Sequence, residues 1–256
     1  MLMHTFAFST NWEFEGMELN TFSIVGRCER TGQLGVAVSS AVPSVGSMCI
    51  YIEPGIGAVS TQSWVNPYLA MEALAFMQEQ ADASQALDRA IASDPDSRLR
   101  QIGSIAISGS GAAFTGADCT AWNGHLVGED YAIQGNMLTG PETLEAMQQT
   151  WLSDMSMDLA ERLMRALEAG DQAGGDFRGK QSAALKVMGR EIYAEVDLRV
   201  DEHCEPVVEL RRVFQVAKQQ LLPFVQGMPK RHGQSAALPE SVMQMLLKPP
   251  ASRVVG

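Results

Sequence analysis

A threonine at the start of a predicted strand has the clearest chemistry in this sequence. Thr21 begins the run TFSIVGRC, in which side chains alternate between two faces, with Thr21 and Ser23 on the polar face. If the chain began at Thr21, this residue would carry both a hydroxyl nucleophile and a free α-amine. An α-amine titrates at about 7.7–8.0, so it could act as the base for the neighbouring hydroxyl. The expected chemistry is attack on an amide carbonyl.

Polar side chains on otherwise apolar predicted strands are further candidates. Gln62 and Ser63 end one strand, just before Asn66. Asn136 lies with Gln134 on one face of another strand. Buried amides are costly unless they are paired, so two interpretations stay open. Either these groups satisfy one another in the core, or they line a cavity and bind an acyl group. In the cavity, Asn136 or a backbone N–H near Gln62 and Ser63 would hold the oxyanion.

A glycine-rich loop, GGDFRGKQS at residues 174–182, nearly matches the phosphate-binding pattern GxxxxGK[ST]. Gln181 stands where the Mg²⁺-binding hydroxyl should be. A predicted helix precedes the loop and a strand follows it, which is the reverse of a phosphate-binding loop, so we expect no nucleotide here. Two interpretations remain. Arg178 clamps a substrate carboxylate and Asp176 orients it, or the loop is a helix-to-strand turn with a surface ion pair.

Other catalytic or metal chemistry finds less support. The four histidines have no metal-ligand spacing, and no GxSxG elbow occurs. A Cys or Ser triad would have to use His125 or His203. Asp197, Asp201 and Glu202 favour a solvated acidic edge over a cation site. We therefore expect no metal and no other cofactor, and a small molecule as substrate.

Composition argues against several classes of partner. The formal net charge of −11 disfavours binding to nucleic acid or to an anionic membrane. No apolar run approaches the ~20 residues that span a membrane, and the amino terminus lacks the basic and apolar regions of a signal peptide. The four dispersed cysteines indicate reduced thiols in a cytoplasmic protein rather than a disulfide framework.

Predicted strands and helices come in runs along the sequence. Such runs indicate an α+β fold with largely antiparallel sheets covered by helices, because a parallel sheet would alternate strand and helix. We expect a hairpin at 21–38, strands at 48–53, 56–63, 101–108, 112–115, 131–138, 181–188 and 196–200, helices capped by Asn66, Asp82 and Thr139, a helix from Leu159 closed by Gly170, and a helix from Pro206.

Three parts are expected along the chain. They are an N-terminal extension at 1–20, one domain at 21–222 and a tail at 223–256. The tail is rich in Pro, Gly and unpatterned Met, so we expect it to follow the surface or to be mobile. Its apolar residues Met243, Met245, Leu246 and Leu247 could pack against another subunit, which would make a homo-oligomer.

Five segments carry a resemblance to a known family. They read TFSIVGR…TGQLGVAVSS, GIGAVSTQSWVNP, YAIQGNML, GDFRGKQSAAL and VDLRVDEHCEPVVELRR. Over about Thr21–Arg212 the chain resembles domain of unknown function 1028, a family grouped with the N-terminal nucleophile (Ntn) hydrolases. The resemblance implies a four-layer αββα sandwich with two mainly antiparallel sheets. It also implies a mature chain that begins with Thr, Ser or Cys at a strand start, and Thr21 matches that position. It implies no substrate.

The sequence departs from the family pattern at two points. Members commonly expose the threonine by losing an initiator methionine, but Glu18-Leu19-Asn20 separates Met17 from Thr21. No lysine precedes Lys180, so no lysine on a neighbouring strand would depress the pKa of the Thr21 amine. Three hypotheses follow. Autocatalytic cleavage of the Asn20–Thr21 bond gives an amidase, or the fold is kept by a non-catalytic binding or scaffold protein, or a Cys- or Ser-based amidase works without processing.

Overall fold

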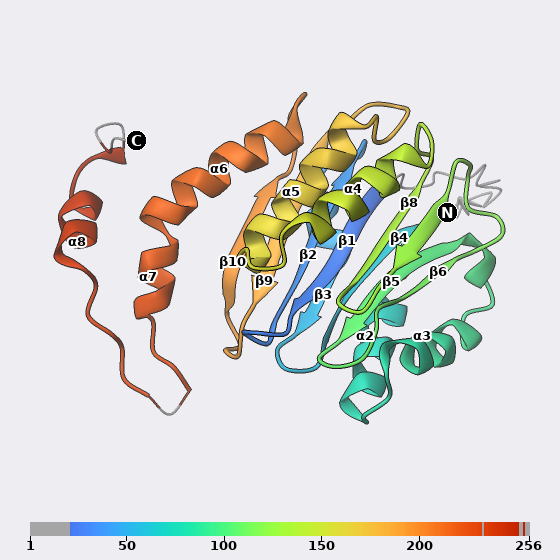
Figure 1. Cartoon of the computed structure of the whole chain (residues 1–256), viewed down its shortest axis with the longest axis horizontal. Coiled ribbons are helices and arrows are strands. Elements are labelled where there is room, and N and C mark those ends of the chain that lie inside the picture. The colour runs from blue at the N-terminus through green and yellow to red at the C-terminus, as the bar shows by residue number, and fades with distance from the viewer. Residues whose placement is uncertain (1–20, 232, 251–252, 254–256) are drawn as a thin grey trace, which may run out of the picture.

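The computed structural model has four layers, two antiparallel sheets packed face to face between two layers of helices (Figure 1). It describes residues 21–231, 233–250 and 253, so the expected extension at 1–20 lies outside the described residues. One helix layer holds α4 (Glu142–Ser153), α5 (Leu159–Gln172) and α6 (Pro206–Gln220), and the other holds α2 (Pro67–Gln78) and α3 (Ala83–Ala92). The α+β class and the αββα layering expected from the sequence are confirmed.

The larger sheet has the order β10-β9-β2-β1-β8-β7 and the smaller sheet the order β3-β4-β5-β6. The larger sheet contains β1 (Thr21–Cys28), β2 (Gln33–Ser40), β7 (Gly124–Val127), β8 (Tyr131–Asn136), β9 (Ser182–Met188) and β10 (Ala194–Val200). The smaller sheet contains β3 (Ile50–Glu53), β4 (Gly57–Ser63), β5 (Arg100–Ala106) and β6 (Ala112–Thr115). Because β1 is central in its sheet, its first residue is flanked by a strand on each side.

The first hairpin forms as its sequence predicts. Gly32 adopts a φ of 71° in the turn, a conformation that glycine reaches without a steric penalty. Phe22 and Ile24 point into the core under the helices, while Val25 packs between the sheets. This alternation puts the side chain of Thr21 on the inter-sheet side, opposite Ser40 in the register of the hairpin.

Helix starts follow the sequence signals in two cases and depart from them in a third. Asn66 caps α2 by accepting the N–H of Tyr68 at 3.1 Å, and Asp82 caps α3 in the same way. The capping box predicted at Thr139 is wrong, because α4 begins at Glu142 after Pro141. The N–H of Thr139 instead donates to the carbonyl oxygen of Gly175, next to an isolated antiparallel β-bridge between Leu138 and Asp176.

Several short elements are absent from the sequence prediction. They are α1 (Val45–Met48), the 3₁₀ turn Ser97–Leu99, β7, α7 (Leu222–Gly227) and α8 (Glu240–Leu246). The helix α5 also runs on to Gln172 rather than ending at Gly170. Gly170 lies inside this helix, close against α4, where a Cβ atom would lie only 2.8 Å from Met147 Cγ. This close approach explains why the position is a glycine although the helix does not end there. Within the described part of the chain, no helix is long and apolar enough to cross a membrane.

Candidate functional site

The space between the two sheets is polar at one end. Strand alternation turns a set of buried polar side chains toward the facing sheet there, and each is fully buried. The set, called the polar end from here on, comprises Thr21, Ser23, Ser40, Ser60, Gln62, Gln101, Gln134 and Asn136. The other end of the same space, called the apolar end, is filled by Val25, Leu34, Val36, Ala58, Ile105 and Ala132.

Gln101 on β5 is the centre of the hydrogen-bond network in the polar end. Its Oε1 accepts from Gln62 Nε2 at 2.8 Å and from Asn136 Nδ2 at 2.9 Å. Its Nε2 donates to Thr115 Oγ1 at 3.0 Å and to the carbonyl oxygen of Gly135 at 2.8 Å. This one amide therefore joins strands of both sheets. Sequence reasoning gave Gln101 no role, although a lone amide on an apolar strand is the same signal that singled out Gln62.

A second set of contacts passes through Ser23. Its hydroxyl donates to Gln62 Oε1 at 2.6 Å and accepts from Gln134 Nε2 at 2.5 Å. The side chain of Gln134 crosses the space directly over Gly103, where a Cβ atom would lie 1.9 Å from Gln134 Oε1. Gly103 is therefore the residue that lets the two sheets approach around this amide.

Thr21 is held between two strands at the end of this network. Its Oγ1 lies 3.2 Å from Ser40 Oγ on β2, and its carbonyl oxygen accepts from Gln62 Nε2 at 3.0 Å. On its other side it is paired in register with Asn136 on β8. The three predicted site residues Thr21, Gln62 and Asn136 are thus brought together, and Ser40 joins them.

The network leaves specific atoms unpaired. Gln134 Oε1, Asn136 Oδ1, Ser60 Oγ and Ser63 Oγ are buried and have no hydrogen-bond partner among the described residues. Ser63 also has a φ of 63°, in the left-handed region. Of the two interpretations offered by the sequence, mutual satisfaction accounts for the amide-to-amide bonds. The unpaired buried atoms mean that it does not account for the whole polar end.

The loop at 174–182 lies beside the same strand ends. Asp176 is buried and its Oδ2 accepts the N–H of Ala41 at 3.2 Å, directly after β2. The N–H of Phe177 donates to the carbonyl of Met137 at 3.1 Å, directly after β8. Arg178 is exposed and pairs with Asp176 Oδ2 at 3.1 Å. The predicted clamp residues therefore lie at the end of the sheet where Thr21 lies, with the guanidinium toward solvent.

The loop has none of the context of a nucleotide site. It connects α5 to β9, as the sequence indicates, and Lys180 Nζ contacts Asp171 at 3.0 Å and Glu205 at 2.8 Å. The pKa of Lys180 is raised, because these two carboxylates outweigh the cost of partial burial. The ammonium group is thus engaged by the protein's own acids.

Asn66 stands apart from the network. Besides capping α2, its Nδ2 donates to Asp94 Oδ2 at 3.0 Å, and Asp94 also pairs with Arg100 Nε at 2.7 Å. Burial alone would raise the pKa of Asp94, but hydrogen bonds from Arg100, Asn66 and the N–H of Asp96 lower it. These contacts give Asn66 an anchoring function, and its predicted substrate contact stays a prediction.

The described cysteines and histidines do not form a nucleophile–base pair. Burial raises the pKa of Cys49 to about 12, which keeps it a thiol. His125 Nδ1 bonds to Thr115 Oγ1 at 2.9 Å, and His203 Nδ1 accepts the N–H of Glu205 at 3.0 Å. Among the described residues, neither ring is hydrogen-bonded to a cysteine or a serine. Burial lowers the pKa of His125 and so favours its neutral form.

The acidic residues near β10 are engaged in ion pairs. Asp197 pairs with Lys186 and Asp201 pairs with Arg199. Among the residues that the structure describes, no cluster of three or more His, Cys, Asp or Glu is arranged to hold a metal ion.

Comparisons with known proteins agree with the resemblance. The model of the family of unknown function DUF1028 matches residues 21–210. The crystal structure of protein SPO2555 from Silicibacter pomeroyi, labelled with the same family, is 25% identical with a TM-score of 0.78, and the match covers 86% of this chain and 96% of that one.

More distant matches are Anbu structures. Anbu (ancestral beta-subunit) from Yersinia bercovieri is 12% identical, with a TM-score of 0.38 over 82% of this chain and 99% of that one. An Anbu (Gly-1) mutant from Hyphomicrobium sp. strain MC1 is 13% identical, with a TM-score of 0.38 over 82% of this chain and 100% of that one. No curated protein matches the chain.

Proposed function

We propose that this chain, which belongs to the DUF1028 family, hydrolyses amide bonds with Thr21 as its nucleophile, after the residues before Thr21 have been removed. The observation that carries the proposal is the position of Thr21. It is the first residue of a central strand, its hydroxyl bonds to Ser40 Oγ at 3.2 Å, and Asn136 lies beside it in register.

Removal of residues 1–20 needs a reaction of Thr21 with its own peptide bond. Thr21 Oγ attacks the carbonyl carbon of Asn20, the C–N bond to Thr21 breaks, and an ester to Oγ forms. The hydroxyl proton passes to the nitrogen that becomes the α-amine. Water then hydrolyses the ester, which leaves a carboxylate on Asn20 and a free amine and hydroxyl on Thr21. Ser40 orients the hydroxyl for this attack.

In turnover the freed amine acts as the base. It accepts the proton as Thr21 Oγ attacks the substrate amide, and it returns the proton to the nitrogen as the C–N bond breaks. Water then hydrolyses the acyl ester on Thr21 Oγ, which releases the acid and restores the hydroxyl. Asn136 Nδ2 has a second N–H besides the one given to Gln101, and this donor is available for the oxyanion. A backbone N–H near Gln62 and Ser63 is the other candidate donor. Loss of one such donor typically costs roughly 2.7–4 kcal/mol of transition-state stabilisation.

Substrate selection is assigned to the loop at 174–182. Arg178 is exposed beside the strand ends that flank Thr21, and Asp176 fixes its guanidinium through a contact of 3.1 Å. A guanidinium held in this way binds a carboxylate in two parallel hydrogen bonds. The substrate class is therefore a small amide or peptide that carries a carboxylate.

The experiment tests processing and turnover separately. The wild-type chain, Thr21→Ala and Thr21→Ser are expressed, their masses are measured, and each is assayed on a panel of acyl amides with and without a carboxylate. Processing and hydrolysis are expected for the wild type, slower reactions for Thr21→Ser, and neither for Thr21→Ala with unchanged circular dichroism. Hydrolysis by Thr21→Ala at the wild-type rate would contradict the proposal.

A second function is favoured by one observation. While residues 1–20 are attached, the nitrogen of Thr21 belongs to a peptide bond, so its amine is not free, and its side chain is fully buried. A binding or scaffold protein with the same fold would keep this form. It would show no cleavage, and its ligand affinity would not change in Thr21→Ala.

A further inference from the structure

The chain ends in an extension with an exposed apolar surface. Residues 221–250, called the C-terminal arm from here on, hold α7 and α8 and extend beyond the edge of the larger sheet at β10 (Figure 1). Met243 on α8 and Leu247, the residue directly after this helix, are 42% and 80% exposed and lie four positions apart in the sequence. Leu221 and Phe224 are exposed on the same arm. Such a concentration of exposed apolar side chains marks an interaction surface.

The charge of the arm is opposite to that of the rest of the chain. The arm carries three basic residues, Lys230, Arg231 and Lys248, and one acidic residue, Glu240, in a chain of net charge −11. Within the described part of the chain, none of the three basic side chains forms an ion pair with a carboxylate. A basic arm on an acidic protein is complementary to the body of a second copy.

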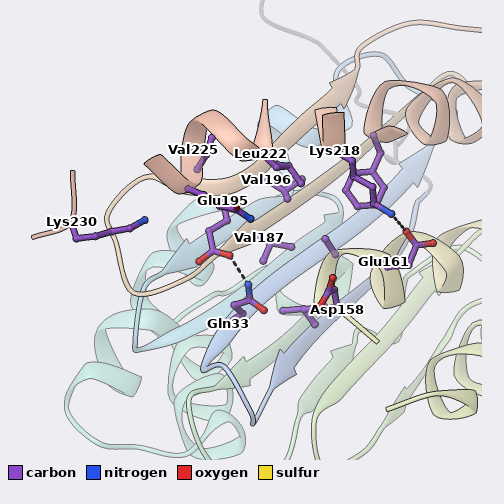
Figure 2. Close-up of a pocket in the computed structure, with 14 residues that line it drawn as sticks. Gln33, Asp158, Glu161, Val187, Glu195, Val196, Lys218, Leu222, Val225 and Lys230 are labelled. Atoms are coloured by element: carbon purple, nitrogen blue, oxygen red, sulfur yellow. Dashed lines mark hydrogen bonds and ion pairs between the residues drawn. The ribbon is translucent and has the colours of Figure 1, made fainter. Parts of the chain in front are cut away.

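A groove of suitable chemistry lies where the arm leaves the body. It is a cavity of about 460 Å³ between α5, α6, α7 and the strands β9 and β10 (Figure 2). Its floor is apolar and is formed mainly by Leu159, Val187, Val196, Phe214, Leu222 and Val225. Three acids, Asp158, Glu161 and Glu195, and two bases, Lys218 and Lys230, complete its lining.

The three acids at the groove differ in their pairing. Glu161 is paired with Lys218, and Glu195 is bonded to the neutral amide of Gln33 (Figure 2). Asp158 is exposed and its side chain makes no capping bond to α5. Within the described residues, neither Asp158 nor Glu195 forms an ion pair, although Glu195 lies near enough to Lys230 for their charges to attract, so Asp158 is the acid that the groove leaves without a basic neighbour.

We propose that the groove receives helix α8 of a second copy, and that each copy gives its α8 to the other about a two-fold axis. Met243 and Leu247 of one copy pack on the apolar floor of the other. Lys248, the next residue along, faces Asp158. In such a two-fold arrangement each copy contributes the same two surfaces, its α8 and its groove, so the assembly is complete as a dimer. Apolar side chains followed by a lysine match an apolar floor with a carboxylate beside it, so the arrangement favours a second copy over a lipid surface.

Sedimentation velocity over a concentration series tests the proposal on the full-length chain. The wild type is expected to form dimers, and Leu247→Glu to weaken the dimer by about tenfold or more, because it places a carboxylate on an apolar floor beside the carboxylate of Asp158. Leu152→Glu is the matched control, since Leu152 is 52% exposed on α4, outside the arm and the groove. It is expected to leave the dimer unchanged.

A charge exchange tests the docking itself. Lys248→Glu is expected to weaken the dimer, and Lys248→Glu combined with Asp158→Lys to restore part of the loss. A wild-type chain that stays monomeric would overturn the proposal, as would equal effects of Leu247→Glu and Leu152→Glu. Binding of monomers to phosphatidylserine vesicles that is lost in Leu247→Glu would overturn it in favour of a membrane surface. These outcomes do not depend on Thr21 or on hydrolysis.

Discussion

The polar and apolar ends of the inter-sheet space are built by the same strands and differ in the groups they bury. Along β1, Val25 packs against aliphatic side chains of the facing sheet, while Ser23 and Thr21 enter a network of amides. Apolar burial between the sheets stabilises their packing by roughly 25 cal/mol per Å². Each buried hydrogen bond contributes a net of only about 0.5–1.5 kcal/mol. We therefore infer that the hydrogen bonds of the polar end serve mainly to fix the positions of its side chains, Thr21 among them, and add little net free energy of folding.

The first and largest expected effect is at the centre of the network. Gln101→Leu leaves the donors of Gln62 and Asn136 and the carbonyl of Gly135 without their partner. Each buried polar group left unpaired costs about 1–3 kcal/mol, so we expect a loss of about 4 kcal/mol in the free energy of unfolding, measured in urea. Gln149→Leu, at an exposed position of α4, is the control. A loss no larger than the control's would contradict the network.

The next effect is at the apolar end. Ile105→Ala removes a fully buried side chain between the sheets and should cost about 3 kcal/mol. The polar end is left intact, so the folded variant should still process its N-terminus at the wild-type rate. Mass spectrometry of the folded fraction measures this rate. Loss of processing in protein that is fully folded would mean that the two ends are not separable.

A smaller effect concerns the pH dependence of stability at Asp94, which lies beside the start of β5. The pKa of Asp94 is lowered in the folded state by Arg100 and Asn66, against the effect of burial. A lowered pKa stabilises the fold above the unfolded value of about 3.9, and the gain is lost as the pH falls through the folded value. Asp94→Asn should therefore cost about 2 kcal/mol at neutral pH and make stability less dependent on pH below about 4. Urea melts across this range measure it, and parallel pH profiles for the two proteins would refute the assignment.

The smallest effect separates paired from unpaired hydroxyls. Ser60 Oγ has no hydrogen-bond partner among the described residues, while Ser23 Oγ bonds to Gln62 and Gln134. Ser60→Ala should change the free energy of unfolding by no more than about 0.5 kcal/mol, and Ser23→Ala should cost about 1–3 kcal/mol. Equal losses in thermal melts would mean that Ser60 has a partner such as a bound water.

Local signals in the sequence predicted the parts of the site that lie on one strand. The alternation along β1 separated Phe22 and Ile24, which face the helices, from Ser23, which faces the other sheet. Asn66 and Asp82 correctly predicted the starts of two helices. The resemblance, rather than periodicity, supplied the four layers and the role of Thr21.

Contacts between distant segments were not predictable in the same way. Gln101 has the local signal of a lone amide on an apolar strand, but its central position depends on partners on β8, which only the packing of the two sheets brings to it. Thr139 looked like a cap, but its N–H is taken by the loop at 174–182. Strand β7 has four residues and lies at a sheet edge, too short to give a clear alternation.

The amino terminus of the protein purified from the cells that make it tests the central claim most directly. Intact-mass analysis and N-terminal sequencing would identify the first residue. If Thr21 is the nucleophile, the chain should begin at Thr21, with its hydroxyl and its free amine on one residue. A chain that keeps residues 1–20 throughout its life in the cell, and still hydrolyses amides, would contradict the account.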